Sequence, residues 1–518
     1  MSKRLCCLIL CLMLLPVWAF AENVDDSLII GMLSTKTTEL RPLTPKERDI
    51  ISLYGVIYES LVTIDDNGIP QPLLAETWVE TNGGKTWTFT LRENITFSDG
   101  TPLTAQDVAA SGQYILALAN NDQGTDRGFY ANIRYMVDSF SAPDSRTVVV
   151  KTKRPYYGIL YSLTFPVVPA SQVDMANPLG TGPYVVTAFE AGSYMLLNAN
   201  PHWWQMQPQV QEITVTFYPN NKDMITAYEY GRVDTVFTRS VAAAQYKSGI
   251  SSLSITYETR QLETLFINHR ERSFPLDSLK VRQAIRYAIN KDLIAQNVYM
   301  GMTTDANTPI PSSSWLYLDQ ESTFVYNPDK ARELLAEDGW VDLDGTGVLN
   351  KVVAGADKPK NLVLSLYVYE DPENDVRFET ANMIADMLAE VGISVHIETV
   401  SYAECKQVLE NGSFDLALCA FQMDVAPDIG FFLRKGNSQN YGRYNSSEMT
   451  SLIDTLRTQE NQSDFAYTTQ AIQQQFAADV PFICLFYRTG AILTRKMYTT
   501  VRSIREFELL RGIEAFGR

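Results

Sequence analysis

Apolar and polar residues alternate with two different periods along this chain, and the two periods predict both strands and helices. Residues 86–91 alternate strictly between polar and apolar, as a half-buried strand does. Residues 28–32 form a short apolar run that is also typical of a strand, whereas residues 50–61 repeat their apolar positions at helical spacing. A capping-box sequence predicts a further helix over residues 105–118.

The second half of the sequence predicts strands and helices in alternation. The expected order is a strand, a helix, a strand, a helix and a strand, over residues 362–369, 377–391, 393–400, 402–411 and 415–421. Such a succession favours an α/β lobe in which the strands lie side by side. Because no long flexible linker is visible, the chain is expected to cross between its lobes more than once and to form a hinge.

The length and composition favour a soluble protein with two or three lobes. The chain has 518 residues, which is too long for one compact core. Hydrophobic residues make up 45% and charged residues 20%, a balance that is typical of globular proteins.

The first 21 residues have the pattern of a secretory signal peptide. Lys3 and Arg4 form a basic start, residues 5–17 form an apolar run, and residues 19–21 supply the small residues of a cleavage site. We therefore expect residues 1–21 to be removed and the mature chain to be exported, to the periplasm or to the extracellular face. No later apolar run has the length of a membrane span.

The charge and the few metal-ligating residues exclude several classes of function. The formal net charge is −17, and no basic stripe is present, which argues against nucleic-acid binding. The three histidines, at positions 202, 269 and 396, show no ligand spacing, so neither a metal site nor another cofactor is expected. Beyond the signal peptide the cysteines are Cys405, Cys419 and Cys484, which allow at most one disulfide.

A series of short motifs then runs in order over nearly the whole expected mature chain. The motifs lie at residues 58–62, 72–78, 87–92, 97–108, 180–184, 200–204, 230–234, 280–291 and 327–340. In this order they closely resemble the signature of the peptide/nickel class, or family 5, of bacterial extracellular solute-binding proteins. That class includes the oligopeptide- and dipeptide-binding proteins of ABC importers.

The resemblance implies an α/β fold of the three-lobe periplasmic-binding-protein type, also called a Venus flytrap, with a discontinuous lobe I. A ligand would lie between lobes I and III and be buried when the hinge closes. Lobe II would comprise residues 62–177 and lobe III residues 268–487. Lobe I would comprise residues 22–61, 178–267 and 488–518.

The same resemblance suggests which residues would bind a peptide. It places the ligand ammonium at Asp424, with Asp428 as the rival, although Asp424 could equally cap a turn. The backbone of Ala420, Phe421 and Gln422 would pair with an extended peptide, and Phe421 would form a wall of the pocket.

Two further positions concern the ligand carboxylate and the facing lobe. Dipeptide binders of the family clamp the carboxylate with an arginine just before a helix of lobe III, and Asp371 stands at that position here. The nearest arginine is Arg377. This departure favours longer peptides, ligands with a cationic group, or a carboxylate that is bound elsewhere. On the lobe I side, residues 44–49, including Lys46, are expected to face the ligand.

The implied function is that of a binding protein without enzymatic activity. It would capture peptides or another small solute and deliver them, as a monomer, to the transmembrane subunits of an ABC permease. Other possibilities are a sugar, an opine or another cationic solute as ligand, or a sensor with the same fold. An exported hydrolase is a further alternative, but the sequence contains neither G-x-S-x-G nor H-E-x-x-H.

Overall fold

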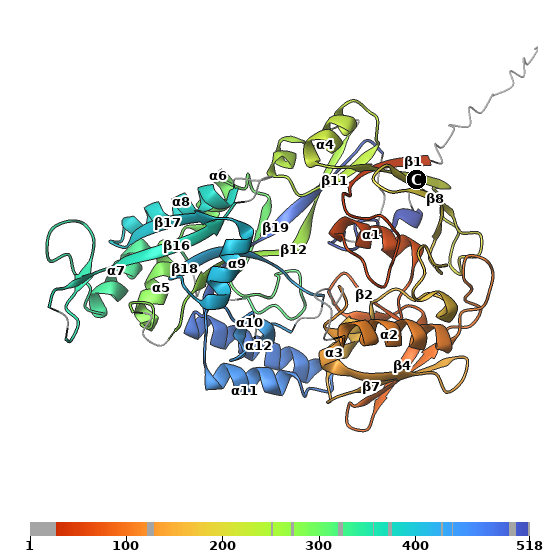
Figure 1. Cartoon of the computed structure of the whole chain (residues 1–518), viewed down its shortest axis with the longest axis horizontal. Coiled ribbons are helices and arrows are strands. Elements are labelled where there is room, and N and C mark those ends of the chain that lie inside the picture. The colour runs from red at the N-terminus through yellow and green to blue at the C-terminus, as the bar shows by residue number, and fades with distance from the viewer. Residues whose placement is uncertain are drawn as a thin grey trace, which may run out of the picture.

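A large mixed sheet runs through the computed structural model from one end to the other (Figure 1). Its strand order is β17-β16-β18-β12-β19-β11-β1-β10-β9-β8, and β13 pairs with β19 beside this path. The strands are β1 (Ser27–Leu33), β8 (Tyr184–Glu190), β9 (Tyr194–Ala199), β10 (Glu212–Tyr218), β11 (Thr235–Thr238), β12 (Leu253–Ile267), β13 (Thr303–Asp305), β16 (Val363–Tyr369), β17 (Ser394–Val400), β18 (Leu416–Gln422) and β19 (Phe482–Thr494).

The structure describes most of the chain after its first residues. The described ranges are 27–121, 129–249, 252–270, 274–319, 325–355, 357–370, 376–425, 428–437, 439–496 and 504–515. Two sequence predictions, the signal peptide at residues 1–21 and the role of Asp371, fall outside these residues.

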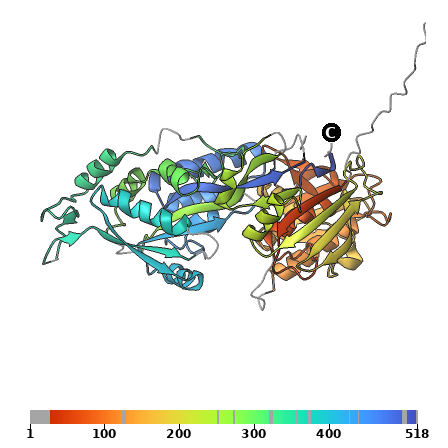
Figure 2. The same cartoon turned by 90° about the horizontal axis from the view of Figure 1, so that it is seen from above.

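Two long antiparallel strands, β12 and β19, connect the two ends of the sheet. β12 pairs with β18 from Gln261 to Ile267, and it pairs with β19 over most of its length. The pairing with β19 is interrupted by a bulge between Glu258 and Leu262. Every residue of β19 is buried. Figure 2 shows these two strands passing from one half of the elongated molecule to the other, which makes them the candidate hinge.

The end of the sheet formed by β16, β17 and β18 has the strand–helix alternation that the sequence predicts. The helices of this alternation are α8 (Val376–Ala389) and α9 (Tyr402–Asn411). The two strands β16 and β17 are parallel over their whole length, as expected for strands joined by a helix. Helices α5 (Leu279–Ala288), α6 (Lys291–Asn297) and α7 (Pro328–Glu337) belong to the same half of the molecule (Figure 1).

A separate four-stranded antiparallel sheet lies beside the other end (Figure 1). Its order is β4-β5-β7-β6, from β4 (Ala75–Thr81), β5 (Thr86–Leu91), β6 (Val137–Ser141) and β7 (Thr147–Thr152). Helix α2 (Ala105–Ala119) packs against β6 and β7, and its first turn has the predicted capping box. The alternation of residues 86–91 is explained by this arrangement, because β5 buries only one face.

Helix α1 (Arg48–Ile57) is shorter than the sequence predicts, since the expected helix extended to residue 61. The chain becomes extended at Tyr58, which caps the helix with its backbone N–H on Tyr54. Glu59 then turns into the interior, where it accepts hydrogen bonds from distant side chains. Local periodicity could not indicate this end, because the partners of Glu59 lie far along the sequence.

The half of the molecule that contains β16 to β18 also touches the four-stranded sheet domain. The backbone N–H of Tyr157 donates to the carbonyl of Gln459 at 2.7 Å, and the ring of Phe465 packs on Tyr156 and Tyr157. Helix α12 (Gln462–Asp479) carries Phe465. None of the helices in the described ranges is long and apolar enough to cross a membrane.

Candidate ligand-binding site

Strand β18 ends near the middle of the molecule, and one of its edges is open there. On one side, β12 pairs with the last three residues of β18, Ala420, Phe421 and Gln422. On the other side, β16 pairs only with residues 416–418. Within the described ranges, no strand therefore pairs with the second edge of residues 420–422. Such an edge presents backbone N–H and C=O groups that an extended peptide can use.

The side chains of these three residues differ in their surroundings. Phe421 is half-buried and packs against the rings of Phe266, Phe432 and Tyr441, with centroid distances of 5.1, 4.7 and 6.2 Å. Its side chain therefore belongs to an aromatic cluster of this half of the molecule. Gln422 is exposed and donates from Nε2 to Glu506 at 3.4 Å.

Asp424 lies just beyond the open edge and has no ion pair among the described residues. Its carboxylate accepts hydrogen bonds from Asn132 Nδ2 at 2.6 Å and from the backbone N–H of Val425 at 2.6 Å. Its backbone carbonyl accepts from Arg260 Nη1 at 2.8 Å. A carboxylate has about four acceptor positions, so Asp424 retains capacity for a further donor.

The rival carboxylate, Asp428, is already neutralised. Arg457 donates to it from Nε at 2.9 Å, and the backbone N–H of Gly430 donates at 2.8 Å. An opposite charge at this distance favours a structural role for Asp428. Of the two candidates, Asp424 is therefore the one that is suited to an external ammonium group.

The residues expected to face the ligand from lobe I are mostly engaged with the protein itself. Glu47 accepts hydrogen bonds from the backbone N–H groups of residues 35–37 and from the hydroxyl of Ser34. Burial opposes ionisation of Glu47, but these donors outweigh it and lower its pKa to about 2. Lys46 is exposed, and no contact of its side chain is seen within the described part of the chain.

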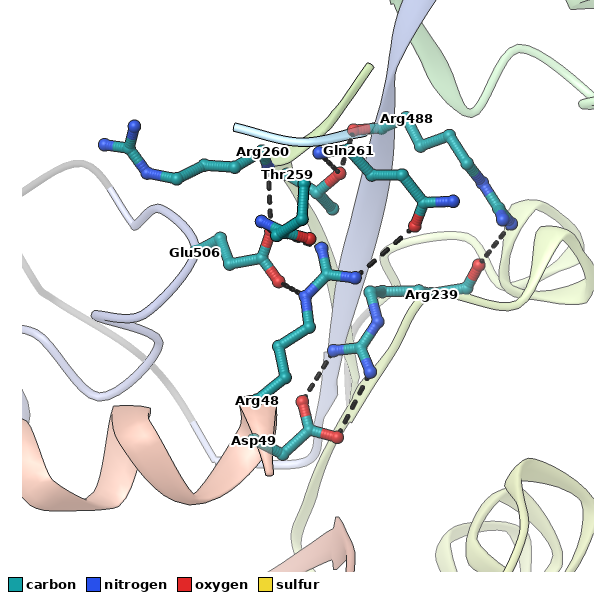
Figure 3. A network of polar contacts seen from close by, with 9 residues as sticks. Arg48, Asp49, Arg239, Thr259, Arg260, Gln261, Arg488 and Glu506 are labelled. Carbon is teal, nitrogen blue, oxygen red and sulfur yellow. Dashed lines mark hydrogen bonds and ion pairs between the residues drawn. The ribbon is translucent and has the colours of Figure 1, made fainter. Parts of the chain in front are cut away.

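Next to Lys46, Arg48 belongs to a polar network at the candidate hinge (Figure 3). Its Nε and Nη2 donate to the two oxygens of Glu506, and its Nη1 donates to Gln261 at 3.4 Å. The backbone N–H of Arg260 donates to Glu506 at 2.7 Å. Glu506 is only 3% exposed, so its carboxylate is held in the interior by donors from three separate parts of the chain, with Gln422 as the third.

A second part of the network joins α1 to β19. Arg239 donates to both oxygens of Asp49, at 2.5 and 3.2 Å. The carbonyl of Arg239 accepts from Arg488 Nη2 at 3.1 Å, and the carbonyl of Arg488 accepts from Thr259 at 2.8 Å. Figure 3 shows the two parts side by side. The bulge in β12 thus lies where arginines from several elements converge.

A cavity of about 500 Å³ lies between α1, the four-stranded sheet domain and residues 507–514. Its walls contain the aromatic side chains of Tyr54, Tyr58, Phe129, Tyr130, Trp203, Trp204 and Phe507. Among the described residues of the predicted lobe III, only Val425, which follows Asp424, lines the cavity. The cavity therefore begins beside the candidate ammonium partner but extends toward the predicted lobes I and II.

Glu59 lies in the wall of this cavity and was not singled out as a site residue from the sequence. It accepts hydrogen bonds from Trp204 Nε1 at 2.8 Å, Thr181 at 2.9 Å, Trp203 Nε1 at 3.3 Å and Gln205 at 3.4 Å. Burial raises its pKa to about 7, although all four donors act in the opposite direction. Three motifs that are far apart in the sequence meet at this carboxylate.

The arginine nearest to the expected carboxylate clamp is committed elsewhere. Arg377 forms an ion pair with Glu263, in which the two side chains are 3% and 0% exposed. The guanidinium also lies over the ring of Tyr369, at 4.4 Å. In the part of the chain that the structure describes, no group of three histidine, cysteine, aspartate or glutamate residues could hold a metal ion.

Comparisons with known proteins agree with this architecture. A family model for bacterial extracellular solute-binding proteins, family 5 Middle, matches residues 70–443. The oligopeptide-binding protein AppA of Bacillus subtilis is 24% identical over 488 residues, which cover 89% of this chain and 86% of the relative. Heme-binding protein A of Haemophilus influenzae is 23% identical, with 86% of this chain and 84% of that protein covered.

The solved structures show the same fold. The structure of AppA from Bacillus subtilis in complex with a nonapeptide has a TM-score of 0.67 at 21% identity and covers 94% of this chain and 98% of that one. Since the family model spans more than half of the sequence, the chain belongs to family 5 of the bacterial extracellular solute-binding proteins.

Proposed function

We propose that this protein is the solute-binding component of an ABC importer and that it captures peptides. The observation that carries the proposal is the open edge of residues 420–422 beside Asp424. An extended peptide would add to this edge as a strand, and its ammonium group would be held by the carboxylate of Asp424. Backbone pairing of this kind tolerates many side chains, which suits a general peptide binder.

The family supports this assignment. The similar proteins include one named for oligopeptides and one solved with a nonapeptide. The cavity of about 500 Å³ beside Val425 would receive a ligand side chain, and its aromatic walls favour an apolar or cationic one.

Closure would occur by bending of β12 and β19 about the bulge at residues 258–262. A ligand stabilises the closed state only by its differential affinity for that state. The closed form would then dock on the transmembrane subunits of a permease as a monomer, without catalysis by this chain. Cleavage after residue 21 would release the mature protein outside the cytoplasm.

Native mass spectrometry of gently purified protein tests the proposal, followed by titration with a library of short peptides. A set of added masses that resolves into short peptides is the expected result. A single non-peptide mass, such as a sugar, an opine or a haem, would overturn peptide capture while leaving the family unchanged. Release of cleaved peptide during the titration would instead indicate an exported hydrolase.

A further inference from the structure

Glu506 occupies a complete carboxylate-binding site within the protein. The guanidinium of Arg48 donates to both carboxylate oxygens, and the backbone N–H of Arg260 donates to one of them (Figure 3). The side-chain amide of Gln422 completes the set of donors at 3.4 Å. A two-pronged guanidinium contact is the geometry with which proteins recognise carboxylates. We call these three donors, from Arg48, Arg260 and Gln422, the carboxylate seat.

The carboxylate seat is assembled from the elements between which a ligand is expected. Arg48 begins α1 in the predicted lobe I, Arg260 lies in the bulge of β12, and Gln422 ends the open edge of β18. A carboxylate in this position therefore links the predicted lobes I and III across the candidate hinge. A bound peptide would make the same kind of link.

The segment that carries Glu506, residues 504–515, lies across the site as a strap. Arg505 donates to the backbone carbonyls of residues 64 and 65, at 2.5 and 2.7 Å. The ring of Phe507 packs on Phe129, with the centroids 5.0 Å apart. The strap also forms one wall of the 500 Å³ cavity. It thus touches all three predicted lobes and borders the space that a ligand would enter.

The usual position for a carboxylate clamp offers no free arginine here. Asp371 stands where an arginine is expected from the resemblance, and Arg377 is bound to Glu263. We propose that the carboxylate seat is the subsite for the ligand's terminal carboxylate, and that Glu506 is an internal occupant which the ligand displaces. This inference rests on the proposed function, because it assumes a peptide on the edge of β18.

Displacement has a measurable consequence for affinity. When only a fraction of the molecules has a vacant subsite, the apparent dissociation constant rises by the inverse of that fraction. Loss of the charge on Glu506 weakens its hold on Arg48, so the vacant fraction increases. Peptides with a free carboxylate should then bind more tightly, whereas peptides with a C-terminal amide gain nothing from the vacated subsite.

The experiment compares the full-length wild type, Glu506→Gln and the control Glu337→Gln by calorimetric titration. Glu337 also pairs with a basic side chain, that of Lys280, but the pair is exposed and Glu337 is not among the residues that line the cavity. The probes are one library peptide in two forms, the free acid and the C-terminal amide. We expect Glu506→Gln to bind the acid about tenfold more tightly, with the amide unchanged, and Glu337→Gln to bind both forms as the wild type does.

Each other outcome has a definite meaning. Equal affinities of the wild type and Glu506→Gln for the acid would overturn the inference and leave peptide capture intact. If Glu506→Gln raises the affinity for the acid and for the amide equally, the strap blocks entry of the ligand, but the carboxylate seat does not bind the terminal carboxylate. Absence of peptide binding in every variant would overturn the proposed function and the inference with it. If Glu506→Gln does not fold, Glu506→Asp keeps the charge, shortens the reach and should give a smaller gain in the same direction.

Discussion

Arg377 donates from Nη2 and Nε to the two oxygens of Glu263, at 3.1 and 3.2 Å, and both side chains are almost fully buried. The pair joins α8 to the middle of β12, so it ties a helix of one half of the molecule to a strand of the candidate hinge. Gln261 also donates to Glu263, at 3.2 Å. The arginine is thus a structural element of the candidate hinge.

Replacement of Arg377 by methionine should lower the free energy of unfolding by about 3–5 kcal/mol, because a buried carboxylate would remain without its counter-charge. Urea denaturation followed by circular dichroism measures this change. The matched control is Lys280→Met. Lys280 pairs with Glu337 at 3.1 Å, but both side chains are more than 40% exposed, so the cost there should stay below about 1 kcal/mol. A similar cost for both variants would contradict the structural role of the buried pair.

Glu59 should make the protein less stable as the pH rises. Its pKa is about 7 in the folded protein, against 4.5 for an ordinary glutamate, so the folded state keeps a proton that the unfolded state has lost. The contribution of this group is complete below pH 4.5 and is lost between pH 4.5 and 7. The rise in the pKa of Glu59 on folding corresponds to a contribution of about 3 kcal/mol to the free energy of unfolding.

The comparison for Glu59 is with Glu59→Gln, which cannot titrate. The difference in unfolding free energy between wild type and variant should change by about 3 kcal/mol across this pH range, in favour of the variant at the higher pH. Urea titrations at four or five pH values provide the measurement. A difference that stays constant with pH would show that folding does not raise the pKa of Glu59.

Asp424→Asn should weaken the binding of peptides with a free ammonium group by about 2 kcal/mol, which is a rise of about 30-fold in the dissociation constant. The reason is that a charge-assisted hydrogen bond is replaced by a neutral one. N-acetylated forms of the same peptides should be affected little. Asp428→Asn serves as the control: it removes the ion pair with Arg457 and should reduce stability without changing affinity. If Asp428→Asn weakens peptide binding and Asp424→Asn does not, Asp428 is the partner of the ammonium group and Asp424 is not.

The three described cysteines are free and buried. Cys405 of α9 and Cys419 of β18 lie near each other, since the neighbouring thiol lowers the pKa of Cys405 and raises that of Cys419, whereas Cys484 lies near Arg286 and Lys291. Refolding with oxidised glutathione should therefore form the Cys405–Cys419 disulfide and release two molecules of reduced glutathione, with Cys484 still a thiol. Peptide mapping by mass spectrometry identifies the pair. A disulfide that contains Cys484 would contradict this arrangement.

The sequence predicts the regular elements well where one local period is sufficient. The alternation of residues 86–91 and the helix and strand succession after residue 362 are both present in the structure. These patterns arise because one face of each element is buried, and the apolar residues along the sequence mark that face. The rest of the fold is predicted from the resemblance of the motifs to the family.

The site is predicted less completely, because its contacts join residues that are far apart along the chain. Asp424 and the edge of β18 are named from the resemblance, and their role stays a prediction. Glu506 could not be named, since its partners Arg48 and Arg260 lie 458 and 246 residues away. No local spacing indicates such a pairing, and a lone glutamate near the end of the chain resembles any exposed acidic residue.

The order of strands in the large sheet has a consequence for how the chain is made. Thr235 of β11 shares a hydrogen bond at 2.8 Å with Thr494 of β19, and β11 also pairs with β1. β19 thus comes after its partner strands β11, β12 and β13 in the sequence. A chain that emerges N-terminus first therefore cannot complete the large sheet until residues 482–494 have been synthesised. Until then β11 and β12 lack the strand with which both pair, and the two ends of the sheet are not joined by hydrogen bonds.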